Sequence, residues 1–159
     1  AVVNTRINAW LKRAPVRVLR GDLTAPVDGE RFDLVVSNPP YVPSETDRLP
    51  TRGPARAWDA GSNGRSLLDR ICTDVPDVLA DGGVLLLLQS ALCGLGKTQV
   101  MLEEQGLEVE IVRSLHIPFG PITTAREGML RRRGLVEEGQ DRERVVVFRA
   151  ARREVAGRG

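Results

Sequence analysis

Aromatic residues are scarce in this sequence, which holds three Phe, two Trp and one Tyr among 159 residues. The hydrophobic core must therefore rest on Val, Leu, Ile and Ala. Cysteine is rarer still: Cys72 and Cys93 do not form a Cys-x-x-Cys pair, and the single histidine cannot complete a zinc site with them. We therefore expect no disulfide framework and no bound metal, but two reduced, partly buried thiols, as is typical of a cytoplasmic protein.

Long apolar runs and a strong charge of one sign are also absent. No stretch reaches the roughly 18–20 apolar residues of a membrane span, and no signal-peptide pattern opens the sequence, so we expect no membrane partner. The formal net charge is +2, which is too small to indicate nucleic-acid binding by itself. A chain of 159 residues corresponds to one domain.

The apolar pattern alternates between helical and strand spacing along the chain. It predicts helices over residues 1–13, 64–79, 96–105 and 123–133, and strands over residues 16–20, 32–37, 84–88, 107–111 and 144–150. Strands that alternate with helices indicate an α/β domain with a mainly parallel sheet, whose last strand can pair antiparallel. Residues 38–61 hold five prolines and no periodicity, and a loop of this length inside a compact domain is usually functional.

The sharpest motif, Asn38-Pro39-Pro40-Tyr41, directly follows the strand predicted over residues 32–37. In an open α/β sheet, ligands bind beyond the carboxyl ends of the strands. Each proline fixes φ and lacks a backbone donor, so the carbonyls of Asn38 and Pro39 are free to accept hydrogen bonds from a ligand. Together with the Asn38 side-chain oxygen they suit a planar NH2 group, and the Tyr41 ring suits a flat substrate or a cation.

Such a site suits the alkylation of a weakly nucleophilic nitrogen. A planar amide nitrogen reacts poorly because its lone pair is delocalised. Acceptors that hold its hydrogens and aim the nitrogen at an electrophilic methyl group supply orientation and electrostatic stabilisation. The motif suits the amine of adenine equally well, so methylation of DNA or RNA is an alternative. The weak net charge favours a protein substrate over a base flipped out of a nucleic acid.

The motif and its surroundings resemble the HemK-type (PrmC-like) glutamine methyltransferases, which are class I enzymes that depend on S-adenosyl-L-methionine. The resemblance rests on Gly21-Asp22-Leu23, on the run from Phe32 to Pro43, and on Asp81-Gly82-Gly83 before an apolar strand. It implies a Rossmann-like fold and methyl transfer to the side-chain amide of the glutamine in the Gly-Gly-Gln loop of a translation release factor. Residues 1–159 would then form a single, partial methyltransferase catalytic domain.

The resemblance also implies roles for the residues of the motif. Asn38 and the carbonyl of Pro39 would hold the glutamine amide, and Pro40 completes the catalytic sequence. Tyr41 would pack near the glutamine and near the sulfonium of the cofactor. Trp58, which opens the sequence Trp58-Asp59-Ala60-Gly61 at the end of the long loop, is a candidate for the wall of the substrate pocket.

The cofactor side of the resemblance is incomplete. Asp22 would accept a hydrogen bond from the adenine amine, Leu23 would lie against the adenine face, and Asn38 would also contact the cofactor. The family also uses a glycine-rich loop after its first strand and an acidic residue after its second, and the sequence shows neither. We therefore expect the first two strands of the family sheet to be missing and the natural protein to extend further at its N-terminus. The alternative is that the chain is a catalytically silent binding module. A small partner subunit is compatible with an enzyme and with a silent module.

Overall fold

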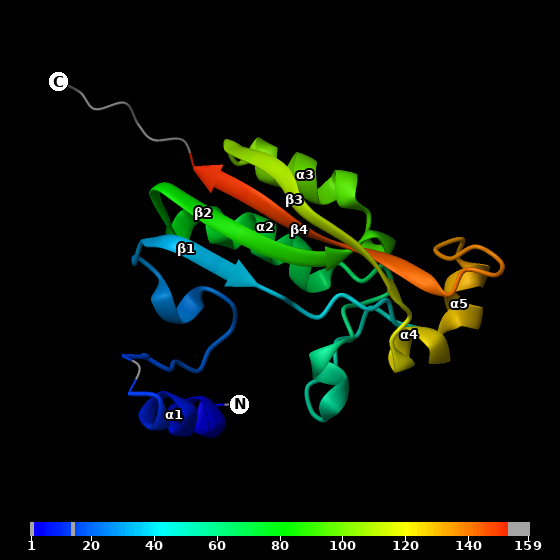
Figure 1. Ribbon diagram of the computed structural model, residues 1–159, viewed down its shortest axis with the longest axis horizontal. Coiled ribbons are helices and arrows are strands. Elements are labelled where there is room, and N and C mark those ends of the chain that lie inside the picture. Colours follow the sequence, from blue (N-terminus) through cyan, green and yellow to red (C-terminus); the bar gives the residue numbers. More distant parts are fainter. Residues whose placement is uncertain (1, 14, 153–159) are drawn as a thin grey trace.

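The computed structural model describes residues 2–13 and 15–152, and its centre is a four-stranded sheet in the order β1-β2-β4-β3 (Figure 1). The strands are β1 (Phe32–Ser37), β2 (Leu79–Ser90), β3 (Leu107–Pro118) and β4 (Arg142–Arg152). β1 and β2 run parallel, whereas β4 pairs antiparallel with both β2 and β3. The α/β class and the antiparallel last strand are thus confirmed, but the prediction of a mainly parallel sheet is wrong.

The sheet has fewer parallel strands than predicted because residues 15–20 form no regular secondary structure. The prediction of a strand over residues 16–20 is therefore wrong. A strand needs a neighbour to satisfy its backbone hydrogen bonds, and no strand in the described part of the chain pairs with this segment. Val16 and Leu19 remain exposed. An alternating apolar pattern cannot by itself reveal whether a partner strand is present.

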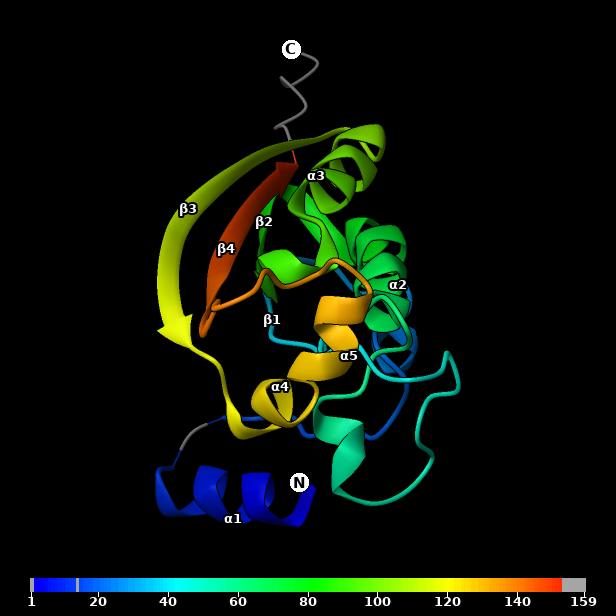
Figure 2. The same cartoon turned by 90° about the vertical axis from the view of Figure 1, so that its right-hand side faces the viewer.

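Two helices, α2 (Ser66–Asp74) and α3 (Leu95–Glu104), cover one face of the sheet (Figure 2). The apolar side chains of both helices pack against alternate residues of β2 and β4, and this core includes Leu68, Cys72, Leu87, Leu102 and Phe148. The opposite face of β1 is open, with Leu34 55% and Val36 69% exposed. The predicted N-terminal helix is present as α1 (Val2–Leu11), which lies apart from the sheet in both views.

The junction between α2 and β2 differs from the prediction of one helix over residues 64–79. The α-helix ends at Asp74, a 3-10 turn follows over Val75–Val78, and β2 begins at Leu79. Pro76 lies in this turn, where its missing N–H costs no ladder bond. The Asp81-Gly82-Gly83 sequence does not precede the strand but forms an irregularity inside it, between the pairs Phe32–Leu79 and Leu34–Val84.

The helix predicted over residues 123–133 is two short helices, α4 (Pro121–Ala125) and α5 (Glu127–Arg132), with a bend at Arg126. They lie beyond the carboxyl ends of β1 and β2, beside the loop that follows β1 (Figure 1). Met129, Leu130 and Val136 form a second, small core there. None of the helices in the described part of the chain is long and apolar enough to cross a membrane.

Candidate functional site

The Asn38–Tyr41 motif leaves the carboxyl end of β1 and enters the long loop. Val42, the next residue, joins the motif to the end of the loop. Its N–H donates to the Trp58 carbonyl at 2.8 Å, and its carbonyl accepts from the Ala60 N–H at 3.2 Å. The hydrogen bonds among the described residues use neither the Asn38 side chain nor the carbonyl oxygen of Pro39. Both oxygens are therefore without a partner among the described residues.

A cavity of about 320 Å³ opens beside the motif. Its walls come from the motif itself, from the 3-10 turn Pro54–Ala57 with the following Trp58, from the end of β3 with the start of α4, and from Glu143 of β4. The structure thus brings together five of the residues expected at the site, namely Asn38, Pro39, Pro40, Tyr41 and Trp58. Most of the lining is apolar, so the few polar atoms would determine how a ligand is oriented.

Tyr41 is half-buried in this cavity, and its phenol stays protonated at neutral pH. Burial raises the pKa of Tyr41 above its ordinary value, and the negative charge of Glu143 raises it further. A protonated phenol can donate a hydrogen bond, and its ring face can attract a cation. Sequence reasoning missed Glu143. The signal lay in the period of two along β4, which places Glu143 in phase with the buried Val145.

Asp22 and Leu23 lie in a second cavity of about 350 Å³. Pro40 lines both cavities, so the two groups of predicted site residues are neighbours but do not share one pocket. Arg70 holds the Asp22 carboxylate at 2.8 Å, and this hydrogen bond lowers the pKa of Asp22, which keeps it ionised. Among the described residues, no group of three or more His, Cys, Asp or Glu side chains is placed to hold a metal ion.

Two arginines of the α4–α5 region hold the long loop in place. Arg126 forms an ion pair with Asp59 at 2.6 Å and donates to the Pro43 carbonyl at 3.0 Å. Arg133 donates to the carbonyls of Ser44 and Ser62 at 2.8 and 2.9 Å. The loop therefore has a defined course although it has little regular structure, because side chains from another part of the chain satisfy its carbonyls.

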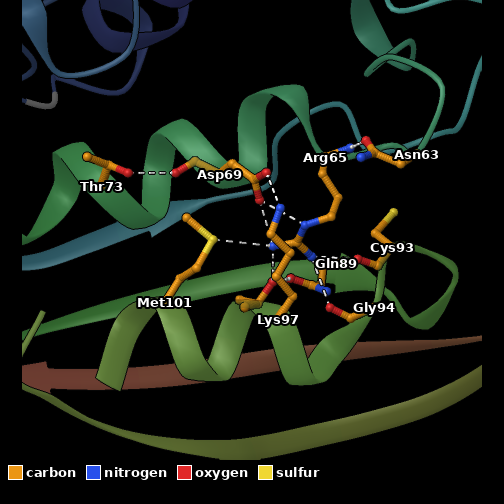
Figure 3. Close-up of polar contacts among 10 residues, drawn as sticks. Asn63, Arg65, Asp69, Thr73, Gln89, Cys93, Gly94, Lys97 and Met101 are labelled. Carbon is orange, nitrogen blue, oxygen red and sulfur yellow. Dashed lines mark hydrogen bonds and ion pairs between the residues drawn. The ribbon is translucent and has the colours of Figure 1, made fainter. Parts of the chain in front are cut away.

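A buried arginine, Arg65, is the centre of a network of polar contacts (Figure 3). Its guanidinium donates to the carbonyls of Cys93 and Gly94, to Thr98 of α3 and to Asp69 of α2. These bonds join the start of α2, the 3-10 turn Ala91–Cys93 that follows β2, and the start of α3. The Cys93 thiol in turn donates to the Tyr41 carbonyl at 2.9 Å. Sequence reasoning missed this network, because an arginine in a helix start gives no sign of burial.

The comparisons with known proteins agree on one class of enzyme. The sequence is 37% identical over 119 residues to a putative protein N5-glutamine methyltransferase of Methanocaldococcus jannaschii, a match that covers 75% of this chain and 60% of that protein. It is 34% identical over 102 residues to the ribosomal protein uL3 glutamine methyltransferase of Bradyrhizobium diazoefficiens, which covers 61% of this chain and 30% of that protein. No protein-family model matches the sequence.

Among solved structures, the fold matches the E. cuniculi Mtq2–Trm112 complex, which is described as responsible for methylation of the translation termination factor eRF1. The TM-score is 0.54 and the identity is 23%, over 92% of this chain and 67% of that one. This likeness shows that the fold is that of class I methyltransferases. The chain spans 60% of the length of the first curated relative and 30% of the second.

Proposed function

Because the chain is a homologue of the HemK-type protein glutamine methyltransferases, we propose that its cavity beside Asn38 holds a glutamine side chain of a protein during methyl transfer from S-adenosyl-L-methionine. The relatives modify different proteins, and we propose that the target of this chain is the glutamine of a Gly-Gly-Gln loop in a translation release factor. One observation carries the proposal: the acceptors of Asn38 and Pro39 are unused by the protein and border a cavity walled by Tyr41 and Trp58.

The chemistry follows from what a glutamine amide needs. Its NH2 group has two hydrogens in one plane, and the Asn38 oxygen and the Pro39 carbonyl offer two acceptors on a stiff backbone. Held in this way, the nitrogen is aimed at the methyl donor without a general base to remove its proton first. Positive charge that develops on the nitrogen during attack strengthens both hydrogen bonds, which favours the transition state over the bound substrate. As the nitrogen–methyl bond forms, the sulfur–methyl bond would break and leave a neutral thioether, and the nitrogen would then give one proton to water.

The residues present fit two parts of the cofactor. S-adenosyl-L-methionine, when bound, supplies an electrophilic methyl group on a sulfonium. Asp22 keeps an ionised carboxylate whose side chain is 70% exposed beside Arg70, so it can accept a further hydrogen bond from an adenine amine. Leu23 offers an apolar surface in the same cavity, and Pro40 joins that cavity to the motif. The sequence has no Gly-x-Gly-x-Gly loop, so the affinity of this chain for the cofactor is a quantity to measure.

The test has two arms, cofactor binding and methyl transfer. Calorimetry of the full chain with S-adenosyl-L-methionine, alone and with a Trm112-type subunit added, separates an enzyme from a silent binding module. Mass spectrometry then measures methylation of a Gly-Gly-Gln peptide, with a Gly-Gly-Asn peptide and an adenine-containing oligonucleotide as controls. We expect a gain of one methyl group on the glutamine peptide alone. Methylation of the oligonucleotide in its place would assign the adenine amine as the substrate.

A further inference from the structure

Glu143 is a largely buried residue whose carboxylate the protein leaves without a partner. It is the second residue of β4, it lies opposite Ile117 of β3, and it lines the same cavity as Asn38 and Tyr41. The residue is only 6% exposed. Among the described residues, no side chain or backbone group forms a hydrogen bond or ion pair with its carboxylate.

The nearest arginines along the chain do not neutralise it. Arg142 and Arg144 flank Glu143 on β4, so their side chains point to the opposite face of the strand. There Arg142 donates to the His116 carbonyl at 2.7 Å, and Arg144 donates to the Ser114 hydroxyl at 2.9 Å. Arg126, at the end of α4, forms an ion pair with Asp59 at 2.6 Å. The cavity therefore holds a negative charge that these cations do not balance.

A ligand that fills the cavity removes water from this unpaired carboxylate, and that cost is repaid only by a counter-charge and hydrogen bonds. The amide of a bound glutamine cannot supply that repayment. Its two hydrogens are already matched by Asn38 and by the Pro39 carbonyl, and it carries no charge. A cation of the ligand can supply it, and the ring face of Tyr41 in the same cavity also attracts a cation.

We propose that Glu143 forms a subsite for a lysine or arginine side chain of the protein substrate, close in sequence to the glutamine that Asn38 holds. The proposal deepens the proposed function and rests on it for the identity of the methylated residue. It makes Glu143 a specificity residue that selects basic segments around the glutamine. A glutamine in a neutral or acidic segment would leave Glu143 buried and unpaired, which disfavours binding.

The test measures binding, so it does not depend on turnover. Fluorescence anisotropy of the full chain is recorded with three labelled peptides that share a Gly-Gly-Gln core and differ at one position, which is arginine, citrulline or glutamate. We expect the arginine peptide to bind at least about tenfold more tightly than the citrulline peptide, which has the same shape without the charge, and the glutamate peptide to bind most weakly.

Glu143→Gln should remove this preference, so that the arginine and citrulline peptides bind equally. Glu104→Gln, at the exposed end of α3, is the matched control and should retain the preference. Thermal unfolding checks the fold: Glu143→Gln removes a buried charge and should not lower the melting temperature, whereas a structural role for Glu143 predicts a loss. Equal binding of both peptides by the unaltered chain, failure to bind either peptide, or an undiminished preference in Glu143→Gln would each overturn the proposal.

The two proposals fail in different ways. If the arginine and citrulline peptides are both methylated and bind with equal affinity, the proposed glutamine methylation stands and the proposed subsite is wrong. If binding is charge-selective and depends on Glu143 but no peptide is methylated, the proposed subsite stands and the proposed reaction is wrong.

Discussion

The Cys93 thiol donates a hydrogen bond to the Tyr41 carbonyl at 2.9 Å, and this contact links the motif to the core of the molecule. The carbonyl of Cys93 is held in turn by the buried guanidinium of Arg65. A chain of polar contacts thus runs from α2 through the turn after β2 to the segment that carries Asn38. The stiffness of the proposed site comes from this support as well as from its two prolines.

Gly64 packs directly against that contact, and we expect Gly64→Ala to disrupt it. A Cβ atom at this position would lie 2.4 Å from the Tyr41 oxygen and 2.7 Å from the Cys93 sulfur, at a φ of +72°. Gly139 is the matched control, because its φ is +78° and a Cβ there meets nothing within 4 Å. Gly139→Ala should cost about 1–2 kcal/mol from backbone strain alone. Gly64→Ala should cost clearly more in urea unfolding, and equal losses would show that the close approach is unimportant.

Arg65 is expected to be among the side chains that matter most for stability. Arg65→Ala leaves the carbonyls of Cys93 and Gly94 without their donor and leaves Asp69 with Lys97 alone. Each buried acceptor that loses its donor costs about 1–3 kcal/mol, so we expect a loss of a few kcal/mol. Arg149→Ala removes an exposed ion pair with Glu110 and should cost less than about 1 kcal/mol. Chemical denaturation of both variants measures the difference. A loss from Arg65→Ala as small as that from Arg149→Ala would contradict the supporting role.

The cysteines should make the fold sensitive to alkaline pH. Burial raises the pKa of the Cys72 thiol to about 11 and that of Cys93 to about 12, from an ordinary value of 9.0. The neutral thiol is thus favoured in the folded state, so this contribution to stability is complete below about pH 9 and is lost as the pH rises toward the folded values. We expect the free energy of unfolding to fall over that range.

Cys93→Ala separates the thiol from other groups that titrate there. The variant should be less stable than the parent near pH 8, and the gap should narrow at higher pH because the parent alone loses the thiol contribution. Both thiols should also resist iodoacetamide in the folded chain below about pH 9 and react after unfolding, since the thiolate is the nucleophile. Rapid labelling of the folded protein, followed by mass spectrometry, would show that the thiols are accessible.

The local features of the sequence predicted the strand before the motif but not the sheet around it. The strand over residues 32–37 could be predicted because a short apolar run with two β-branched residues, followed by two prolines, has few other interpretations. The strand predicted over residues 16–20 failed because pairing is a long-range property, and nothing in its own residues reports on a neighbour. The parallel character of the sheet was wrong for the same reason.

The sequence did not predict residues near the proposed site that lie far from the motif along the chain. Glu143 is far from the motif in sequence and reaches the cavity only because β4 lies beside β2 in the sheet. Trp58 could be suggested from its place at the end of the long loop, but its position depends on the pairing of Val42 with that segment. Asp22 and Leu23 lie in a cavity that adjoins the motif, and no spacing in the sequence indicated that Arg70 would hold Asp22 there.

Asn38 offers the sharpest separation of function from stability. Its side chain is exposed and is not used in the hydrogen bonds of the described residues, so Asn38→Ala should change the free energy of unfolding by less than about 0.5 kcal/mol. Loss of one oriented acceptor at the reacting nitrogen should lower methyl transfer by roughly 10²–10³. Cofactor affinity by calorimetry should change little, because Asp22 and Leu23 are untouched. Turnover equal to that of the parent chain would remove Asn38 from the reaction, since an acceptor that aims the amide cannot be lost without effect.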